Sequence, residues 1–164
     1  MVTRTRFDDS ACPVARSVDA IGDWWSLLIV RDAFDGSRRF GEFQRSLGVA
    51  KNILTARLRT LVAGGILESV PASDGSAYRE YVLTPKGKAL FPVIVALRQW
   101  GEQHFFTPGE AHSQLVDRRQ GEHLRTLEVL SADGRRLGLM TPPSTRSPTT
   151  DPPRSPKDRK AAGP

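Results

Sequence analysis

A cluster of basic residues between Ser37 and Leu67 is the part of the sequence best suited to hold an anionic partner. Its basic residues are Arg38, Arg39, Arg45, Lys51, Arg57 and Arg59. Glu42 is its only acidic residue, so the stretch carries a net charge of +5. Basic side chains without nearby carboxylates can bind phosphate, and arginine can also read guanine through two parallel hydrogen bonds. The local composition therefore predicts a surface for a polyanion, with nucleic acid as the first candidate.

The apolar residues of this stretch recur at helical spacing and predict the helix that presents its cations. Leu54, Leu58 and Leu61 fall on one face of a helix over residues 50–63. Because side chains three and four positions apart share a face, the opposite face is expected to carry a different set. That set is Asn52, Thr55, Ala56 and Arg59. We therefore expect a helix with one apolar face and one polar, basic face.

Glycine, proline and capping residues divide the neighbouring sequence into further elements. Helices are predicted over residues 14–21, 23–36 and 41–47, the second beginning at Asp23 as N-cap and the third ending at Gly48. The other predicted features are a helix end at Gly64-Gly65, two strands around Asp74-Gly75, and a helix from Thr84 and Pro85 to Phe105.

This order of elements predicts a winged helix-turn-helix, a mainly α fold with a small β wing. The short helix over residues 41–47 would brace the helix over residues 50–63. The second of these is slim enough to enter the major groove of double-stranded DNA. The fold and the basic surface therefore point to the same partner.

The side-chain donors and acceptors of the expected interface predict which residues contact bases and which contact phosphates. Asparagine pairs with adenine and arginine with guanine, so Asn52 and Arg59 are the candidates for base reading, and Thr55 shares their face. Lys51 lies at the helix N-terminus, where backbone N–H groups also favour phosphate. The other phosphate candidates are Arg38, Arg39, Arg57 and, in the wing, Arg79. Any one of these side chains alone is an ordinary solvated charge, as Arg45 is expected to be; their joint position favours DNA.

The predicted helix over residues 85–105 is apolar on nearly every side between Leu90 and Trp100. Such a helix needs more than one partner surface. Burial in its own domain and pairing with a second copy both meet that need, and dimerisation is at least as well supported because a small domain offers few walls. Pro92 is expected to kink this helix or to separate its first turn.

Four segments together resemble the HxlR-type winged helix-turn-helix regulators, relatives of the MarR group. The segments, within residues 12–105, are CPVARSVDAIGDWWSLLIVRDAFDGSRRFGEFQRSLG, ILTARLRTLVAGGIL, REYVLTPKGKAL and VALRQWGEQH. The resemblance implies a bacterial transcription factor that binds a near-palindromic operator as a homodimer, built by the first helix and the long C-terminal helix. It also implies that Lys51, Asn52, Thr55 and Arg59 lie on the recognition helix and Arg79 in the wing.

Cys12 is the only cysteine, which fits a reducing cytosol and excludes an internal disulfide. It precedes Pro13 just before the first helix, where a helix N-terminus and Arg16 favour a reactive thiol and acidic neighbours oppose it. In the HxlR-type family a cysteine at this position is common, and some members use it to sense oxidants, quinones or aldehydes. Two interpretations of Cys12 stand: a sensor, or a small buried apolar residue.

Two further sets of residues bear on ligand and metal binding. Trp24, Trp25 and Trp100 are candidates for a ligand pocket near the dimer interface, with core packing as the alternative. The three histidines lack metal-like spacing with the lone cysteine, so no metal site is predicted. The sequence contains no Gly-rich phosphate loop, HExxH or nucleophile elbow, and we predict neither a cofactor nor an enzyme.

Composition divides the chain into four predicted parts. They are an N-terminal arm (residues 1–11), the winged helix-turn-helix domain with its dimerisation helix (12–106), a small β-rich extension with a hairpin at Asp133-Gly134 (107–140), and a disordered basic tail (141–164). The tail holds seven of the twelve prolines and no aromatic residue, so it cannot offset the entropy of ordering. No long apolar run or leader segment is present, which predicts a cytoplasmic protein without a membrane span.

The leading interpretation is a sequence-specific, dimeric transcriptional regulator that responds to an oxidant, an electrophile or a small ligand. The net charge of +6 and the pI near 10.1 agree with an anionic partner. The alternative is a winged-helix protein-interaction module without sequence-specific DNA readout. Asn52, Thr55 and Arg59 separate the two, because an interaction helix more often exposes apolar or aromatic anchors.

Overall fold

The computed structural model describes Phe7 and residues 10–138; the predicted tail over residues 141–164 and most of the predicted N-terminal arm lie outside the described residues. The chain divides into two compact units, residues 1–127 and residues 128–164. The elements are α1 (Pro13–Ile21), α2 (Trp24–Phe34), α3 (Phe40–Leu47), α4 (Lys51–Ala63), β1 (Leu67–Pro71), β2 (Arg79–Leu83), α5 (Pro85–Lys88) and α6 (Phe91–Phe105).

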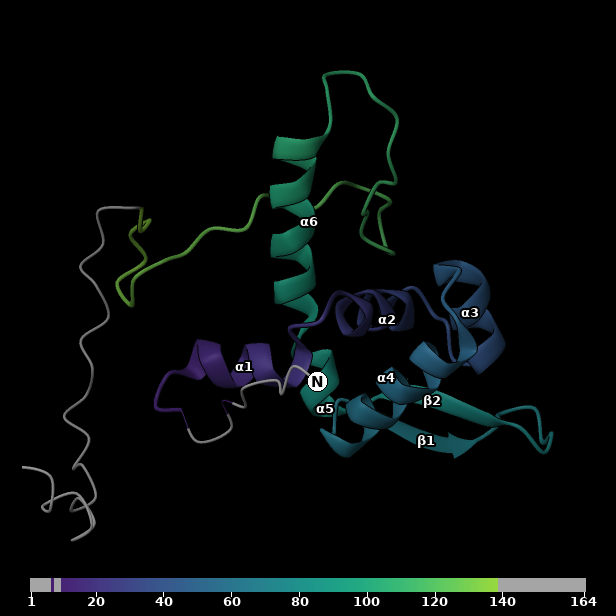
Figure 1. The fold of residues 1–164 in the computed structure, drawn as a ribbon. Coiled ribbons are helices and arrows are strands. Elements are labelled where there is room, and N and C mark those ends of the chain that lie inside the picture. The colour runs from purple at the N-terminus through teal and green to yellow at the C-terminus, as the bar shows by residue number, and fades with distance from the viewer. Residues whose placement is uncertain (1–6, 8–9, 139–164) are drawn as a thin grey trace, which may run out of the picture. The chain divides into compact units, whose positions relative to one another are not determined.

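Helices α2, α3 and α4 pack together as a helix-turn-helix, with the strands of the wing beside α4 (Figure 1). Asp23 caps α2 as predicted, since its side chain accepts a hydrogen bond from the backbone N–H of Ser26 at 3.0 Å. Gly48 ends α3 at a φ of 60°, a left-handed conformation that glycine adopts without a steric cost. The turn between α3 and α4 is therefore where the sequence predicts it.

The core of the first unit is formed where these helices meet β1. Its fully buried side chains include Ile29 and Val30 of α2, Phe43 of α3 and Leu67 of β1. The leucine face of α4 completes it. The core is thus assembled from every element of the helix-turn-helix, which holds α4 in a defined orientation.

Strands β1 and β2 form the predicted wing, an antiparallel pair with Leu67 opposite Leu83 and Pro71 opposite Arg79. The segment before α3 joins the same sheet, because the backbone N–H of Tyr81 donates to the carbonyl of Arg38 at 2.7 Å. The wing is therefore bonded to the chain that leads into the helix-turn-helix.

The predicted helix over residues 85–105 is two helices, α5 and α6. Pro92 lies in the first turn of α6, where its missing N–H costs no helical hydrogen bond. Thr84 caps α5, and its hydroxyl accepts from the backbone N–H of Gly87 at 3.0 Å. A Cβ at Gly87 would lie 2.1 Å from the carbonyl oxygen of Ile66, so only glycine fits this contact between α5 and the start of the wing.

Most of the apolar surface of α6 is not covered by its own domain. Val95 is its buried residue, whereas Val93, Leu97 and Trp100 are exposed. Helix α1 is similar, since Val14 is 69% exposed. Burial in the core of this unit therefore accounts for little of the apolar sequence noted above. No helix among the described residues is long and apolar enough to cross a membrane.

Residues 107–127 belong to the first unit and run back beside α6. The side-chain amide of Gln99 donates to the carbonyl of Arg125 at 2.9 Å, and its oxygen accepts from the backbone N–H of Leu127 at 2.8 Å. These two bonds satisfy both polar ends of one glutamine. They attach the extension to the middle of α6.

The predicted β-rich extension contains isolated bridges instead of strands. In the described part of residues 107–138, β pairing is confined to one bridge between Val116 and His123 and another between Leu130 and Arg136. The second closes the predicted Asp133-Gly134 turn. The apolar side chains here, such as Leu130, stay exposed, so no sheet face is buried to stabilise a longer hairpin.

Candidate nucleic-acid interface

Helix α4 presents the polar face that its spacing predicts. Leu54, Leu58 and Leu61 are buried, which confirms the inward face. The exposed residues of the opposite side include Lys51, Asn52, Ala56 and Arg59. Thr55 is half-buried, and its hydroxyl donates to the carbonyl of Lys51 at 2.8 Å. One exposed surface of α4 thus combines a cation at the N-terminus with an amide and a guanidinium further along.

Arg57 has a carboxylate partner that the local sequence does not contain. Its Nε lies 3.2 Å from Oδ1 of Asp23, the residue that caps α2. This is a charge contact without an aligned hydrogen bond, since the Arg57 Nε is a buried donor with no hydrogen-bond acceptor. The expectation that Arg57 carries an unpaired charge is therefore wrong, and the pair instead joins α4 to the start of α2.

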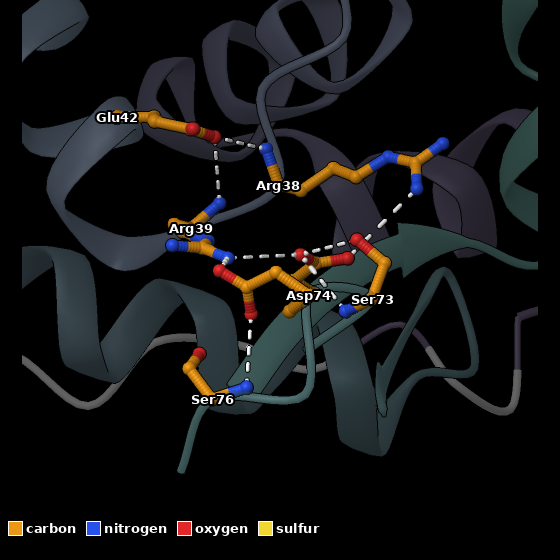
Figure 2. Close-up of polar contacts among 7 residues, drawn as sticks. Arg38, Arg39, Glu42, Ser73, Asp74 and Ser76 are labelled. Atoms are coloured by element: carbon orange, nitrogen blue, oxygen red, sulfur yellow. Dashed lines mark hydrogen bonds and ion pairs between the residues drawn. The ribbon is translucent and has the colours of Figure 1, made fainter. Parts of the chain in front are cut away.

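Arg38 and Arg39 are also paired, by acidic groups of the wing (Figure 2). The guanidinium of Arg39 donates to Asp74 at 2.5 Å and lies 3.6 Å from Glu80. Arg38 lies 3.8 Å from the other oxygen of Glu80. Both acids lie far from these arginines in the sequence. The excess positive charge of residues 37–67 is therefore offset at these two positions by carboxylates from the wing.

Glu80 is the centre of this cluster. Only 4% of the residue is exposed, and one of its oxygens accepts from the backbone N–H and the hydroxyl of Ser73 at 3.3 and 3.0 Å. Arg38 and Arg39 supply the opposite charge. A buried carboxylate is tolerated only when hydrogen bonds and cations replace water. Glu80 therefore ties the wing turn, strand β2 and the segment before α3 together.

The acidic residues around this cluster titrate lower than usual. Hydrogen bonds from Arg39, and then from Ser76, hold the pKa of Asp74 well below its ordinary value of 3.8. Backbone N–H groups of Arg38 and Arg39 lower the pKa of Glu42 from 4.5. A carboxyl whose pKa falls on folding stabilises the fold above its unfolded pKa, and that contribution is lost as the pH falls through the folded value. Both groups are ionised at neutral pH.

A cavity of about 510 Å³ lies between α3 and the wing and brings three arginines together. Arg39, Arg45 and Arg79 line it, together with Tyr78 and Glu42. Arg79 bonds the hydroxyl and the carbonyl of Ser69 on the adjacent strand. The sequence predicts a solvated charge at Arg45 and gives no signal for Tyr78. Only the approach of the wing to α3 places them beside Arg79.

The three tryptophans line neither this cavity nor a second one between α2 and α6. Trp24 is 74% exposed and contacts Trp25 edge to face, and Trp25 packs against the core. Trp100 is exposed and contacts His104 and Phe105. A ligand pocket formed by the tryptophans stays a prediction, since these two cavities have other walls.

Cys12 is exposed at the N-cap position of α1. Its backbone N–H donates to the hydroxyl of Ser10 at 3.1 Å, and Arg16 donates to the carbonyl of Ser10 at 2.5 Å. The alternative in which Cys12 is a small buried residue is therefore wrong. The guanidinium of Arg16 is directed at a carbonyl and not at the thiol.

Comparison with known proteins agrees with this geometry. Residues 20–108 match the HxlR-like helix-turn-helix family. The uncharacterized HTH-type transcriptional regulator Rv3095 of Mycobacterium tuberculosis is 42% identical over 110 residues, which are 67% of this chain and 70% of that protein. The crystal structure of PA1607, described as a candidate transcription factor, is 55% identical with a TM-score of 0.82, covering 87% of this chain and all of that one. The redox regulator HypR in its oxidized form is 33% identical with a TM-score of 0.53, covering 58% and 100%.

We predict that Glu80→Gln lowers the free energy of unfolding by about 1–3 kcal/mol, because it removes the buried charge that Arg38 and Arg39 face. Urea denaturation followed by circular dichroism measures the loss. Glu68→Gln is the matched control, since Glu68 is exposed on the neighbouring strand. Equal stability of the two variants would show that the cluster does not hold the wing.

Proposed function

The chain belongs to the HxlR-like helix-turn-helix family of DNA-binding transcriptional regulators, and from this premise we propose that it binds a near-palindromic operator as a homodimer. The family is one of regulators and not of enzymes. In the proposed complex, the two copies of α4 enter successive major grooves about one turn of DNA apart. Such a protein would work in the cytoplasm, where a bacterial chromosome lies.

The exposed face of α4 is the observation that carries this proposal. Asn52 and Arg59 are exposed there, and each has the donors and acceptors that read a purine through two hydrogen bonds. Lys51 at the helix N-terminus, together with the free N–H groups of the first turn, suits a phosphate. Ile53, which is 36% exposed, is the only exposed large apolar side chain on α4. This composition favours DNA over a protein partner, the alternative function.

The paired arginines have a different role in the proposed complex. Arg38, Arg39 and Arg57 are held by Glu80, Asp74 and Asp23, so a phosphate must compete with a carboxylate for each. Their net gain from binding DNA is therefore smaller than that of a free cation. We assign them to positioning the wing and α4, with phosphate contact as a secondary role. Arg79 lies in the wing, where it can contact the backbone of the same duplex.

A second copy of the chain is the proposed cover for the exposed apolar residues of α1 and α6. Val14 on α1 and Val93, Leu97 and Trp100 on α6 lie in the helices that build the dimer in the resembling family. Exposed apolar surface on two helices of one unit is unfavourable in water and favours association. The symmetry of such a dimer would match the symmetry of the operator.

Base reading predicts a defined loss of affinity. Asn52→Ala and Arg59→Ala should each weaken binding to the preferred sequence by roughly fivefold to 150-fold, because a bidentate base contact contributes about 1–3 kcal/mol. The preferred sequence is first selected from a random duplex library with the full chain. Fluorescence anisotropy at several salt concentrations then gives the affinities.

The control for these variants is Arg119→Ala, which removes the same charge from an exposed position outside the helix-turn-helix. It should leave the preference for the selected sequence unchanged. If Asn52→Ala and Arg59→Ala also bind as the wild type does, α4 does not read bases. If no sequence is enriched in the selection, the interaction-module alternative gains support.

Dimerisation predicts the behaviour of charged substitutions on α1 and α6. Val14→Glu and Trp100→Glu should each raise the dissociation constant of the dimer about a hundredfold or more, because an unpaired charge buried in an interface costs several kcal/mol. Sedimentation velocity over a concentration series measures it. Val129→Glu is the control, since Val129 is 70% exposed in the second unit. A dimer that survives both substitutions uses a different surface.

A redox or electrophile input through Cys12 is a second proposal, supported by the exposed thiol and by the likeness to the redox regulator HypR. Cys12 directly precedes α1, so a group added to its sulfur lies beside the proposed dimer surface. With one cysteine, a disulfide forms only between chains or with a small thiol. Alkylation by iodoacetamide should weaken operator binding several-fold in the wild type and not in Cys12→Ser. Unchanged binding after complete alkylation would refute the sensor.

A further inference from the structure

A second cavity, of about 490 Å³, lies between α2, α6 and the segment that follows α6. Its volume is that of a pocket for a small molecule. Most of its walls are apolar, and they include Leu27, Phe34, Phe91, Ile94, Leu97 and Phe106. Figure 1 shows α6 beside α2 and the following chain turning back toward them. The extension over residues 107–127 thus supplies one wall of the cavity.

The walls of this cavity are held by specific contacts. Phe34 of α2 meets Phe91 of α6 edge to face at 5.3 Å. On the other side, Phe106 packs on the ring of His112 at 4.7 Å. Arg98 of α6 donates to Glu102 at 2.9 Å and to the hydroxyl and the carbonyl of Ser113. The pocket is therefore built by side chains from three segments and does not depend on a single loop.

Two guanidinium groups that line the cavity have N–H donors beyond those that bond Asp32, Glu102 and Ser113. Arg31 and Arg98 both line it, and each guanidinium has five N–H donors. Arg31 uses two of its nitrogens on one oxygen of Asp32, and Arg98 uses two on Glu102 and Ser113. Glu102 is already engaged by Arg98, which leaves Asp35 as the other lining acid. A ligand with an anionic, hydrogen-bond-accepting group matches the remaining N–H groups.

We propose that this cavity is an effector site that takes a small, mainly apolar molecule bearing one anionic group. The role as an effector site rests on the proposed function as a regulator. Helix α2 connects the site to the DNA-reading surface, because Asp23 at its N-terminus contacts Arg57 of α4. A ligand that wedges between α2 and α6 changes the position of α4 relative to α6, which carries the proposed dimer surface. Binding therefore shifts the affinity for DNA.

Gly101 provides a variant that closes the cavity without disturbing the fold. It lies within α6 and lines the cavity, and a Cβ built there meets no atom within 4 Å. Gly101→Phe places a ring in this space. Gly101→Ala adds one methyl group and leaves most of the volume open. Both replace a glycine inside a helix, which favours helix formation, so both should fold.

The test uses the whole chain of 164 residues and two fluorescent probes. The first, 8-anilinonaphthalene-1-sulfonate, is an apolar anion, and the second, N-phenyl-1-naphthylamine, is its analogue without the sulfonate. We expect the anion to bind the wild type and Gly101→Ala about equally, and Gly101→Phe about tenfold or more weakly, because the ring occupies the apolar volume. The neutral analogue should bind the wild type about tenfold more weakly than the anion, because it lacks the charge-assisted hydrogen bonds. Saturating anion should change operator affinity at least about threefold in the wild type and not in Gly101→Phe.

Three outcomes would overturn the proposal. Equal binding of the anion by Gly101→Phe and the wild type would place the probe on the exposed faces of α1 and α6. Equal or tighter binding of the neutral analogue would refute the anionic class. Loss of the dimer in Gly101→Phe, with no probe bound by the wild type, would show that a second copy of the chain fills the cavity.

Operator binding without any probe separates this proposal from the proposed function. If the wild type binds no preferred sequence, the regulator proposal fails, whatever the probes report. If the wild type and Gly101→Phe bind the operator equally well but the anion leaves that affinity unchanged, only the effector site fails. The two results are independent, because the first needs no ligand and the second compares bound and free protein.

Discussion

Burial of the leucine face of α4 is the constraint on which the rest of this structure depends. Leu54, Leu58 and Leu61 are almost completely removed from water between α2, α3 and β1. Burying side chains of this size stabilises the fold by about 1.5–3 kcal/mol each, and the helical repeat then fixes what faces outward. Asn52 and Arg59 are exposed for this reason. The packing of the core and the chemistry of the surface are therefore both set by α4, through its inward and its outward face.

The arginines around α4 are organised by carboxylates from other elements. Asp23 of the α2 cap, Asp74 of the wing turn and Glu80 of β2 each meet a guanidinium of the basic stretch. Exposed ion pairs contribute little to stability, but Glu80 is buried and also holds the Ser73 turn. The pairs therefore set the positions of the wing and of α4. Lys51 and Arg59 stay exposed on α4.

Helix α6 connects three features of the molecule. One side carries Ile94 and Gly101 against the cavity, and Gln99 anchors the extension. Val93 and Trp100 are exposed elsewhere on the helix. A single helix thus contributes to a pocket and to an uncovered apolar surface.

Local patterns in the sequence determined the elements of the fold. Capping and helical periodicity are local effects, so a few residues decide each of these features. They are the caps at Asp23 and Thr84, the turn at Gly48, the leucine spacing of α4 and the break just before Pro92. Only the tertiary structure decided three other features. They are the partners of Arg38, Arg39 and Arg57, the position of Arg45 beside Arg79, and the cavity between α2 and α6. Each joins groups tens of residues apart, such as Arg39 and Asp74, and no local pattern specifies which distant carboxylate or apolar wall a side chain will meet. The exposure of Cys12 and the short bridges of the extension have the same cause, since both depend on which surfaces the rest of the chain covers.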